Sequence, residues 1–246
     1  MSTTDTINFR GFLSSEIEGI REVYRTKHAQ VFAVCEGKSD GAVTSLFGAR
    51  IEEIFGPKKL HLSLALGFWI RCVSSCQAAL LLVERGMVPE AQTLVRSAYE
   101  FLFFAVATSK HPDVLESMMH GDTYVRSEQA RAMLKEGTKA NHLLPSQIDA
   151  LNAIVAEGKG TKQLSVFDAA EKAGMSYLHA TVYRGMSLTG AHATAASTDA
   201  VFQENDEGIS AVFGPSDDGL PFCIGLIDKC LDEGAKHFDP ILQSAN

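Results

Sequence analysis

The chain has 246 residues, of which 46% are hydrophobic and 21% charged, with only 7 prolines. A chain of this length and composition can bury a full hydrophobic core, and it is unlike disordered, collagen-like or low-complexity proteins. Its 30 acidic and 22 basic residues give a formal net charge of −8, which excludes a broad basic surface for nucleic acid or an anionic membrane.

The N-terminal part of the chain has the periodicity of amphipathic helices and no alternating strand pattern. We expect a first helix over residues 9–35, ended by the glycines of residues 37–41. A second helix is predicted over residues 43–55, because Gly56 and Pro57 are typical helix-ending residues.

The most apolar stretch is residues 60–83, which is long enough for a helix to cross a membrane. Arg71 lies at its centre, and Gln77 and several serines add polar groups, so we expect a buried core helix and no membrane span. A buried Arg71 would need a partner for its charge.

A fourth helix is predicted from Pro89, because proline suits the first turn of a helix. Only residues 85–88 separate it from the preceding apolar helix. So short a connection predicts an antiparallel hairpin, and its apolar character places the hairpin at the centre of a bundle.

The remainder is expected to be helical with loops. A more polar fifth helix is predicted from His111 to about Lys135, followed by a surface excursion or lid over residues 136–163. Further helices are predicted over residues 146–156, 165–172, 176–202 and 222–238, with a loop over 208–221. The helix over 176–202 is expected to be interrupted or loosened by Gly185 and Gly190. We therefore expect an all-α, single-domain helical bundle of about eight helices over residues 1–246, around the central apolar antiparallel hairpin.

Two segments contain ionisable groups in apolar surroundings. Arg96 and Glu100 are four residues apart, hence on one helix face, and would form either a structural ion pair or the polar floor of a site. Further along, Tyr183, Arg184 and Ser187 precede His192. A histidine here could act as a general acid or base, although a histidine bonded inside the bundle is the more common case.

The cysteine spacings do not match a metal or redox motif. Cys72 and Cys76 are four apart and Cys223 and Cys230 seven apart, whereas such sites commonly use Cys-x-x-Cys. Together with Cys35 they make an odd number, in a chain without a signal-peptide pattern. We expect reduced, buried thiols in a cytoplasmic protein, with no metal and no cofactor.

The chain also contains the segments Gly86-Met87-Val88-Pro89-Glu90-Ala91, Arg96-Ser97-Ala98-Tyr99-Glu100 and Tyr183-Arg184-Gly185-Met186-Ser187, followed by His192-Ala193. Together they resemble a large family of bacterial all-helical proteins described only as a domain of unknown function, over residues 60–205. The resemblance implies that six side chains converge in the bundle: Arg96, Glu100, Tyr183, Arg184, Ser187 and His192. The family commonly places its histidine four residues after the serine, and here the interval is five.

The arrangement is more distantly similar to HEPN helical bundles, many of which are ribonucleases of toxin or antiviral systems. Their mark is an arginine and a histidine that enclose four to six residues, whereas Arg184 and His192 enclose seven. This likeness implies metal-independent RNA cleavage across a dimer, in which His192 transfers a proton and Arg184 stabilises the phosphorane charge.

The sequence thus leaves several functions open. The first is a bundle with a central polar site that binds a ligand or a partner, with Arg96, Tyr183 and Ser187 as binding residues. The alternative is the HEPN-type ribonuclease, and a third is a small-molecule enzyme with Glu100 as base. We expect a homodimer, because large apolar surfaces commonly mark interfaces. The other expected partner is RNA or a small ligand, bound at a local site.

Overall fold

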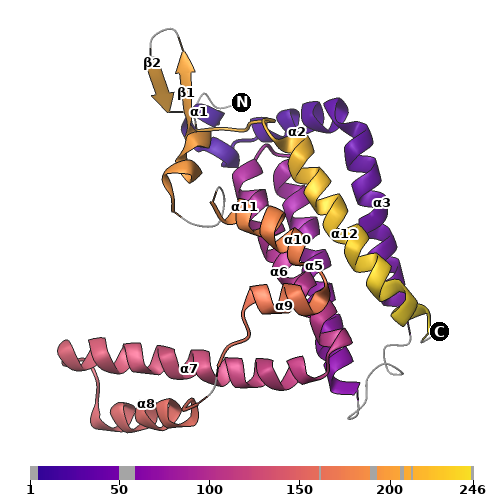
Figure 1. Cartoon of the computed structure of the whole chain (residues 1–246). Helices are drawn as coiled ribbons and strands as arrows, with labels where there is room; N and C mark the ends of the chain where they lie inside the picture. The colour runs from indigo at the N-terminus through magenta and orange to yellow at the C-terminus, as the bar shows by residue number, and fades with distance from the viewer. Residues whose placement is uncertain are drawn as a thin grey trace.

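The computed structural model describes residues 5–49, 59–160, 162–188, 193–205, 208–211 and 213–244. Over these residues the chain is almost entirely helical, which confirms the all-α class (Figure 1). The elements are α1 (Ile7–Arg10), η1 (Gly11–Leu13), α2 (Glu16–Lys27), α3 (Ala29–Gly48), α5 (Leu60–Val83), α6 (Val88–Lys110), α7 (Asp113–Lys139), α8 (Pro145–Glu157), α9 (Val166–Ala173), α10 (Ser176–Leu178), η3 (His179–Tyr183), α11 (Arg184–Met186), η5 (Ala195–Val201), β1 (Phe202–Asn205), β2 (Gly208–Ala211) and α12 (Leu220–Gln243).

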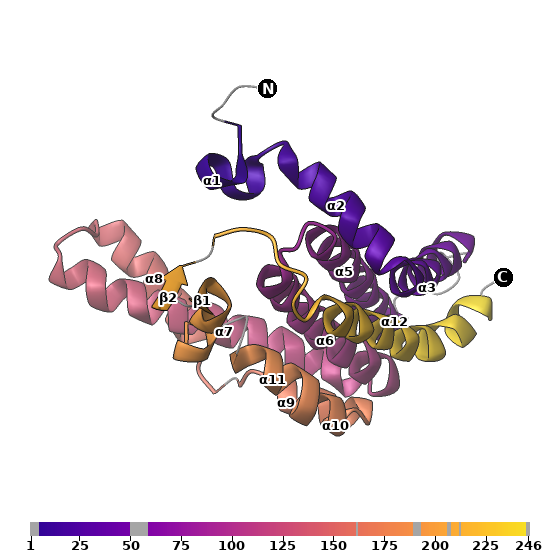
Figure 2. The same ribbon diagram turned by 90° about the horizontal axis from the view of Figure 1, so that it is seen from above.

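The hairpin of α5 and α6 lies at the centre of the bundle, as expected from its apolar sequence (Figures 1 and 2). Helices α3 and α12 lie on one side of it and α9 to α11 on another. The turn between α5 and α6 passes through Gly86, which has a φ of 75°. A Cβ at this position would lie 2.7 Å from Pro215, so both the conformation and the space favour glycine.

The predicted first helix is wrong. The chain forms α1 and the 3-10 turn η1, restarts at Glu16 in α2, and breaks again at His28 before α3. Asp5 explains the first break, because its carboxylate accepts hydrogen bonds from the backbone and side chain of Ser15, and its carbonyl accepts one from Ser14. These bonds fix a corner where periodicity alone predicts a helix.

The predicted stop at residues 37–41 is also wrong, since α3 continues through both glycines to Gly48. Its buried side chains keep a helical spacing across them and pack beside α12. Tertiary packing therefore outweighs the cost of about 1 kcal/mol for each internal glycine. The start of the helix predicted over residues 43–55 belongs to α3, and residues 50–58 lie outside the described part of the chain.

Helix α5 is long and apolar enough to cross a membrane, but half of its most apolar window is buried in the bundle. It carries the core residues Trp69, Cys72 and Cys76, each with no exposed surface. The expectation of a buried Arg71 is wrong: this residue is exposed, and its guanidinium lies 5.1 Å from the centroid of the Phe101 ring. Its charge therefore stays in contact with water.

Helices α7 and α8 form an arm that reaches away from the bundle (Figure 1). Helix α7 extends from Asp113 to Lys139, four residues beyond its predicted end, and α8 packs along it without a buried residue of its own. Of residues 136–160 and 162–163, which the structure describes, none lines the large cavity described below. The position of α8 fits a surface excursion and gives no support to a lid over that cavity.

The helix predicted over residues 176–202 continues through Gly185, and Gly190, its second predicted point of interruption, lies outside the described residues. The helix begins at Ser176, continues through the π-helical turn η3 into α11, and is described as far as residue 188. The chain then forms η5 and an antiparallel pair in which Phe202 of β1 faces Ala211 of β2. These two short strands include part of the predicted loop over residues 208–221.

Candidate functional site

A network of four polar side chains joins α6 to the segment of η3 and α11. Arg96 and Glu100 lie one turn apart on α6, whose other face is fixed in the core by Val95, Ala98 and Tyr99. This anchoring turns the guanidinium and the carboxylate together toward the later segment. The aromatic and hydroxyl partners, Tyr183 and Ser187, come from that segment.

The guanidinium of Arg96 lies at the middle of this network. Its Nε donates a 2.8 Å hydrogen bond to Oγ of Ser187, and its Nη2 donates one of 2.5 Å to the hydroxyl of Tyr183. Its Nη1 lies 3.5 Å from Oε2 of Glu100. The Tyr183 hydroxyl in turn donates a 2.9 Å bond to Oε2 of Glu100. Each edge of the guanidinium thus faces a partner.

The network lies at the border between core and water. Tyr183 is 8% exposed, whereas the side chains of Arg96 and Glu100 are 19% and 36% exposed. Burial, reinforced by the neighbouring Glu100 carboxylate, raises the pKa of Tyr183 to about 12. The phenol therefore stays protonated at neutral pH and remains a donor to the carboxylate.

Aromatic rings hold Tyr183 in place. The ring of His179 stacks on it at a centroid distance of 5.2 Å, and Phe103 meets it edge-on at 6.1 Å. The guanidinium carbon of Arg96 lies 4.3 Å from the centroid of the Tyr183 ring. Burial, with a smaller contribution from Arg184, lowers the pKa of His179. The candidate residues drawn from the sequence did not include His179, although its four-residue spacing from Tyr183 is a visible signal.

The remaining candidates do not join this network. Arg184, the first residue of α11, is exposed. His192 lies outside the described residues, so its position relative to Arg96 and Glu100 is not part of the site described. The structure thus brings together Arg96, Glu100, Tyr183 and Ser187.

A cavity of about 920 Å³ lies near the network, and Phe202 of β1 is among its lining residues. Its walls come from the first turns of α6, from residues 181–186, and from the loop before α12. Gln92, one turn before Arg96, and Met186, next to Ser187, both line it. The network therefore fixes two of the elements that form the wall of the cavity.

The cavity wall is mostly apolar. Four phenylalanines contribute to it: Phe12, Phe202, Phe213 and Phe222. Among the lining residues that the structure describes, the charged ones are two carboxylates, Glu90 and Asp218, and both are exposed. A cavity of this size and composition is typical of sites for small molecules.

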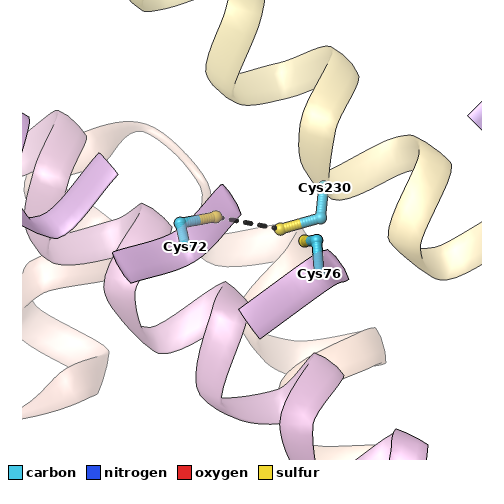
Figure 3. Close-up of side chains that lie close together, drawn as sticks. All are labelled: Cys72, Cys76 and Cys230. Atoms are coloured by element: carbon cyan, nitrogen blue, oxygen red, sulfur yellow. Dashed lines mark hydrogen bonds between the residues drawn. The ribbon is translucent and has the colours of Figure 1, made fainter. Parts of the chain in front are cut away.

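A second cluster consists of cysteine side chains. The expectation that all five cysteines are buried and reduced agrees with the structure, in which all five are free and buried. The structure also brings Cys72, Cys76 and Cys230 together (Figure 3), which sequence spacing could not reveal because Cys230 comes from α12. Burial raises the pKa of Cys72 and Cys230 well above that of a free thiol, so these two thiols are neutral.

The fold and the network define an all-helical bundle with a polar cluster beside an apolar cavity. The chain belongs to a family of unknown function (DUF5677), which it matches over residues 62–209. All four network residues fall inside the matched range, which nearly coincides with the range of the resemblance seen in the sequence. No curated protein and no solved structure matches the chain.

Proposed function

We propose that the protein binds a small, largely apolar molecule in the 920 Å³ cavity. The observation that carries this proposal is the cavity itself, with four phenylalanines on its wall and a volume suited to a drug-sized ligand. The two carboxylates at its border, Glu90 and Asp218, favour a neutral or cationic molecule over an anion.

The polar network has a positioning role in this proposal. Arg96 and Glu100 belong to α6, whereas Tyr183 and Ser187 belong to the later segment. Both segments contribute residues to the cavity wall. Hydrogen bonds between the two segments hold the wall in one arrangement, which lowers the ordering cost of binding.

Nile red, a neutral apolar dye that fluoresces in apolar surroundings, is a suitable probe of the full chain. Thr181 is exposed and lines the cavity, whereas its neighbour Ala180 is exposed and does not. We expect Thr181→Trp to fill the entrance and weaken dye binding by about tenfold or more.

Ala180→Trp is the matched control and should bind the dye like the unsubstituted chain. Absence of dye binding, or equal loss in both variants, would contradict the proposal. Weaker binding of the anionic dye 1-anilinonaphthalene-8-sulfonate than of Nile red would support the charge preference, and stronger binding would contradict that preference.

A ribonuclease of the HEPN type is the second candidate. The observation in its favour is the exposure of Arg184, since an exposed guanidinium is free to meet a phosphate. If it is correct, Arg184→Ala and His192→Ala each abolish RNA cleavage with an unchanged circular dichroism spectrum. A purified chain that cleaves no RNA, or cleavage that survives both substitutions, would contradict it.

The homodimer and the cytoplasmic location stay predictions. Ile70 and Leu81 on α5 are 44% and 57% exposed, so the central hairpin keeps apolar side chains at the surface. Sedimentation equilibrium should give twice the mass of the chain, and a monomer at micromolar concentration would contradict the prediction.

A further inference from the structure

Three thiols from two helices converge in the core of the bundle. Cys72 and Cys76 lie one turn apart on α5, and Cys230 reaches them from α12 (Figure 3). Their three Sγ atoms all lie within 4.8 Å of one another, and those of Cys72 and Cys230 are 3.6 Å apart. Figure 3 shows the sulfur atoms turned toward a common point between the helices.

Burial alone says nothing about a ligand, because a cysteine often packs as a small apolar residue. The convergence of the thiols is more informative. Cys35 and Cys223 are equally without exposed surface, yet neither belongs to the group of mutually close sulfur atoms. A place in the core therefore does not by itself bring thiols together.

The separations suit one shared ion. Metal–sulfur bonds are about 2.3 Å long, so sulfur atoms around a single ion lie about 4 Å apart. A disulfide needs about 2.05 Å between its sulfur atoms, much less than the 3.6 Å between Cys72 and Cys230. The cluster thus matches the spacing of a metal site with only small side-chain movements.

The donor set selects the ion. Sulfur ligands favour soft metals, mainly Cu(I) and Zn(II). Structural zinc takes four ligands, and within the described residues no fourth His, Cys, Asp or Glu side chain joins the three. All three cysteines have no exposed surface, so water from the solvent does not readily supply a fourth ligand. Cu(I) is satisfied by fewer sulfur ligands than zinc.

We propose that Cys72, Cys76 and Cys230 bind one Cu(I) ion. Two thiols lose their protons to solvent and coordinate as thiolates, and the third sulfur coordinates as a neutral thiol. The buried complex then carries a single negative charge, which is less costly in an apolar core than the charge of three thiolates around Cu(I).

The test is an anaerobic titration of the full chain with Cu(I) held by the coloured chelator bicinchoninate. The chain should withdraw one Cu(I) from the chelator, and X-ray absorption of the product should show sulfur ligands only. Failure to withdraw copper would overturn the proposal, as would nitrogen or oxygen ligands in the bound state. Tight binding of one Zn(II) at these cysteines with no uptake of Cu(I) would overturn the choice of metal.

Single substitutions locate the site. Cys76→Ala and Cys230→Ala should each lower the Cu(I) affinity by about tenfold or more. Cys223→Ala is the matched control, because Cys223 is equally buried on the same helix as Cys230 but lies outside the cluster. Circular dichroism spectra should be measured to check that each variant is folded. Equal loss in Cys223→Ala would show scattered thiol binding and would overturn the proposal.

Discussion

The hydroxyl of Tyr183 donates a 2.9 Å hydrogen bond to Oε2 of Glu100, across 83 residues of chain. The bond ties the π-helical turn η3 to α6, and Arg96 braces it through the same hydroxyl. Turns of this kind are frequent at functional sites. Substitutions at this hydrogen bond therefore test both the packing of η3 on α6 and the proposed ligand site.

Tyr183→Phe should lower the free energy of unfolding by about 1–2 kcal/mol, because it removes a hydrogen bond to a charged group and keeps the ring. Urea denaturation followed by circular dichroism measures this change. The control is Tyr177→Phe, since Tyr177 is 78% exposed and its loss of a hydroxyl should have little effect. An unchanged stability in Tyr183→Phe would mean that the bond contributes nothing.

Gly234→Ala should destabilise the protein by about 3 kcal/mol or more. A Cβ at this position would lie 2.0 Å from Cζ3 of Trp69, which is fully buried and stacks on Phe238. Gly225→Ala, on the same helix with nothing within 4 Å, should instead gain up to about 1 kcal/mol. Thermal denaturation and the emission of the single tryptophan report both changes, and equal effects would contradict this packing.

Glu84→Gln should cost about 3 kcal/mol, because Glu84 is 3% exposed and binds three guanidinium groups, those of Arg21, Arg25 and Arg85. Burial opposes its charge, but the hydrogen bonds from Arg21 and Arg25 outweigh burial and lower its pKa. Its contribution is thus present above the unfolded pKa and lost as pH falls through the folded one.

The control for this substitution is Glu36→Gln. Glu36 also binds Arg25, but its side chain is 40% exposed, so we expect a loss below about 1 kcal/mol. Urea denaturation at neutral pH compares the two variants. A cost for Glu84→Gln no larger than that for Glu36→Gln would contradict the role of the buried carboxylate.

Stability should fall between pH 7.5 and 5.5 partly because of His237. Burial, with a smaller contribution from Lys110, lowers its pKa, and its Nε2 lies 2.5 Å from Oγ of Ser109. As pH falls below about 6.5, His237 becomes protonated in the unfolded chain but stays neutral in the folded protein. The free energy of unfolding therefore decreases. His237→Gln should therefore lose less stability over this range than the unsubstituted chain, and an identical loss would exclude His237 as a cause.

The sequence predicts the central hairpin well, because two long apolar helices with a four-residue connection have one simple arrangement. The i to i+4 pair of Arg96 and Glu100 was visible for the same reason. Periodicity could not reveal the corner at Ser14 and Ser15, where side-chain bonds to Asp5 decide the path, nor the passage of α3 through Gly37 and Gly41.

Contacts between segments that are distant in the sequence could not be predicted from local patterns. The meeting of Arg96 with Tyr183 and Ser187 depends on how the late segment packs on α6, and only the family resemblance pointed to it. The contact between the sulfur atoms of Cys230 and Cys72 likewise depends on the packing of α12 beside α5. No local spacing encodes such contacts between distant segments.

A double-mutant cycle of Glu100→Gln and Tyr183→Phe tests most directly that these two distant segments meet in one network. The free energies of unfolding of the unsubstituted chain, both single variants and the double variant give the coupling energy. We predict a coupling of about 1 kcal/mol or more, as for residues in direct contact. A coupling below about 0.3 kcal/mol, as for independent residues, would contradict the account.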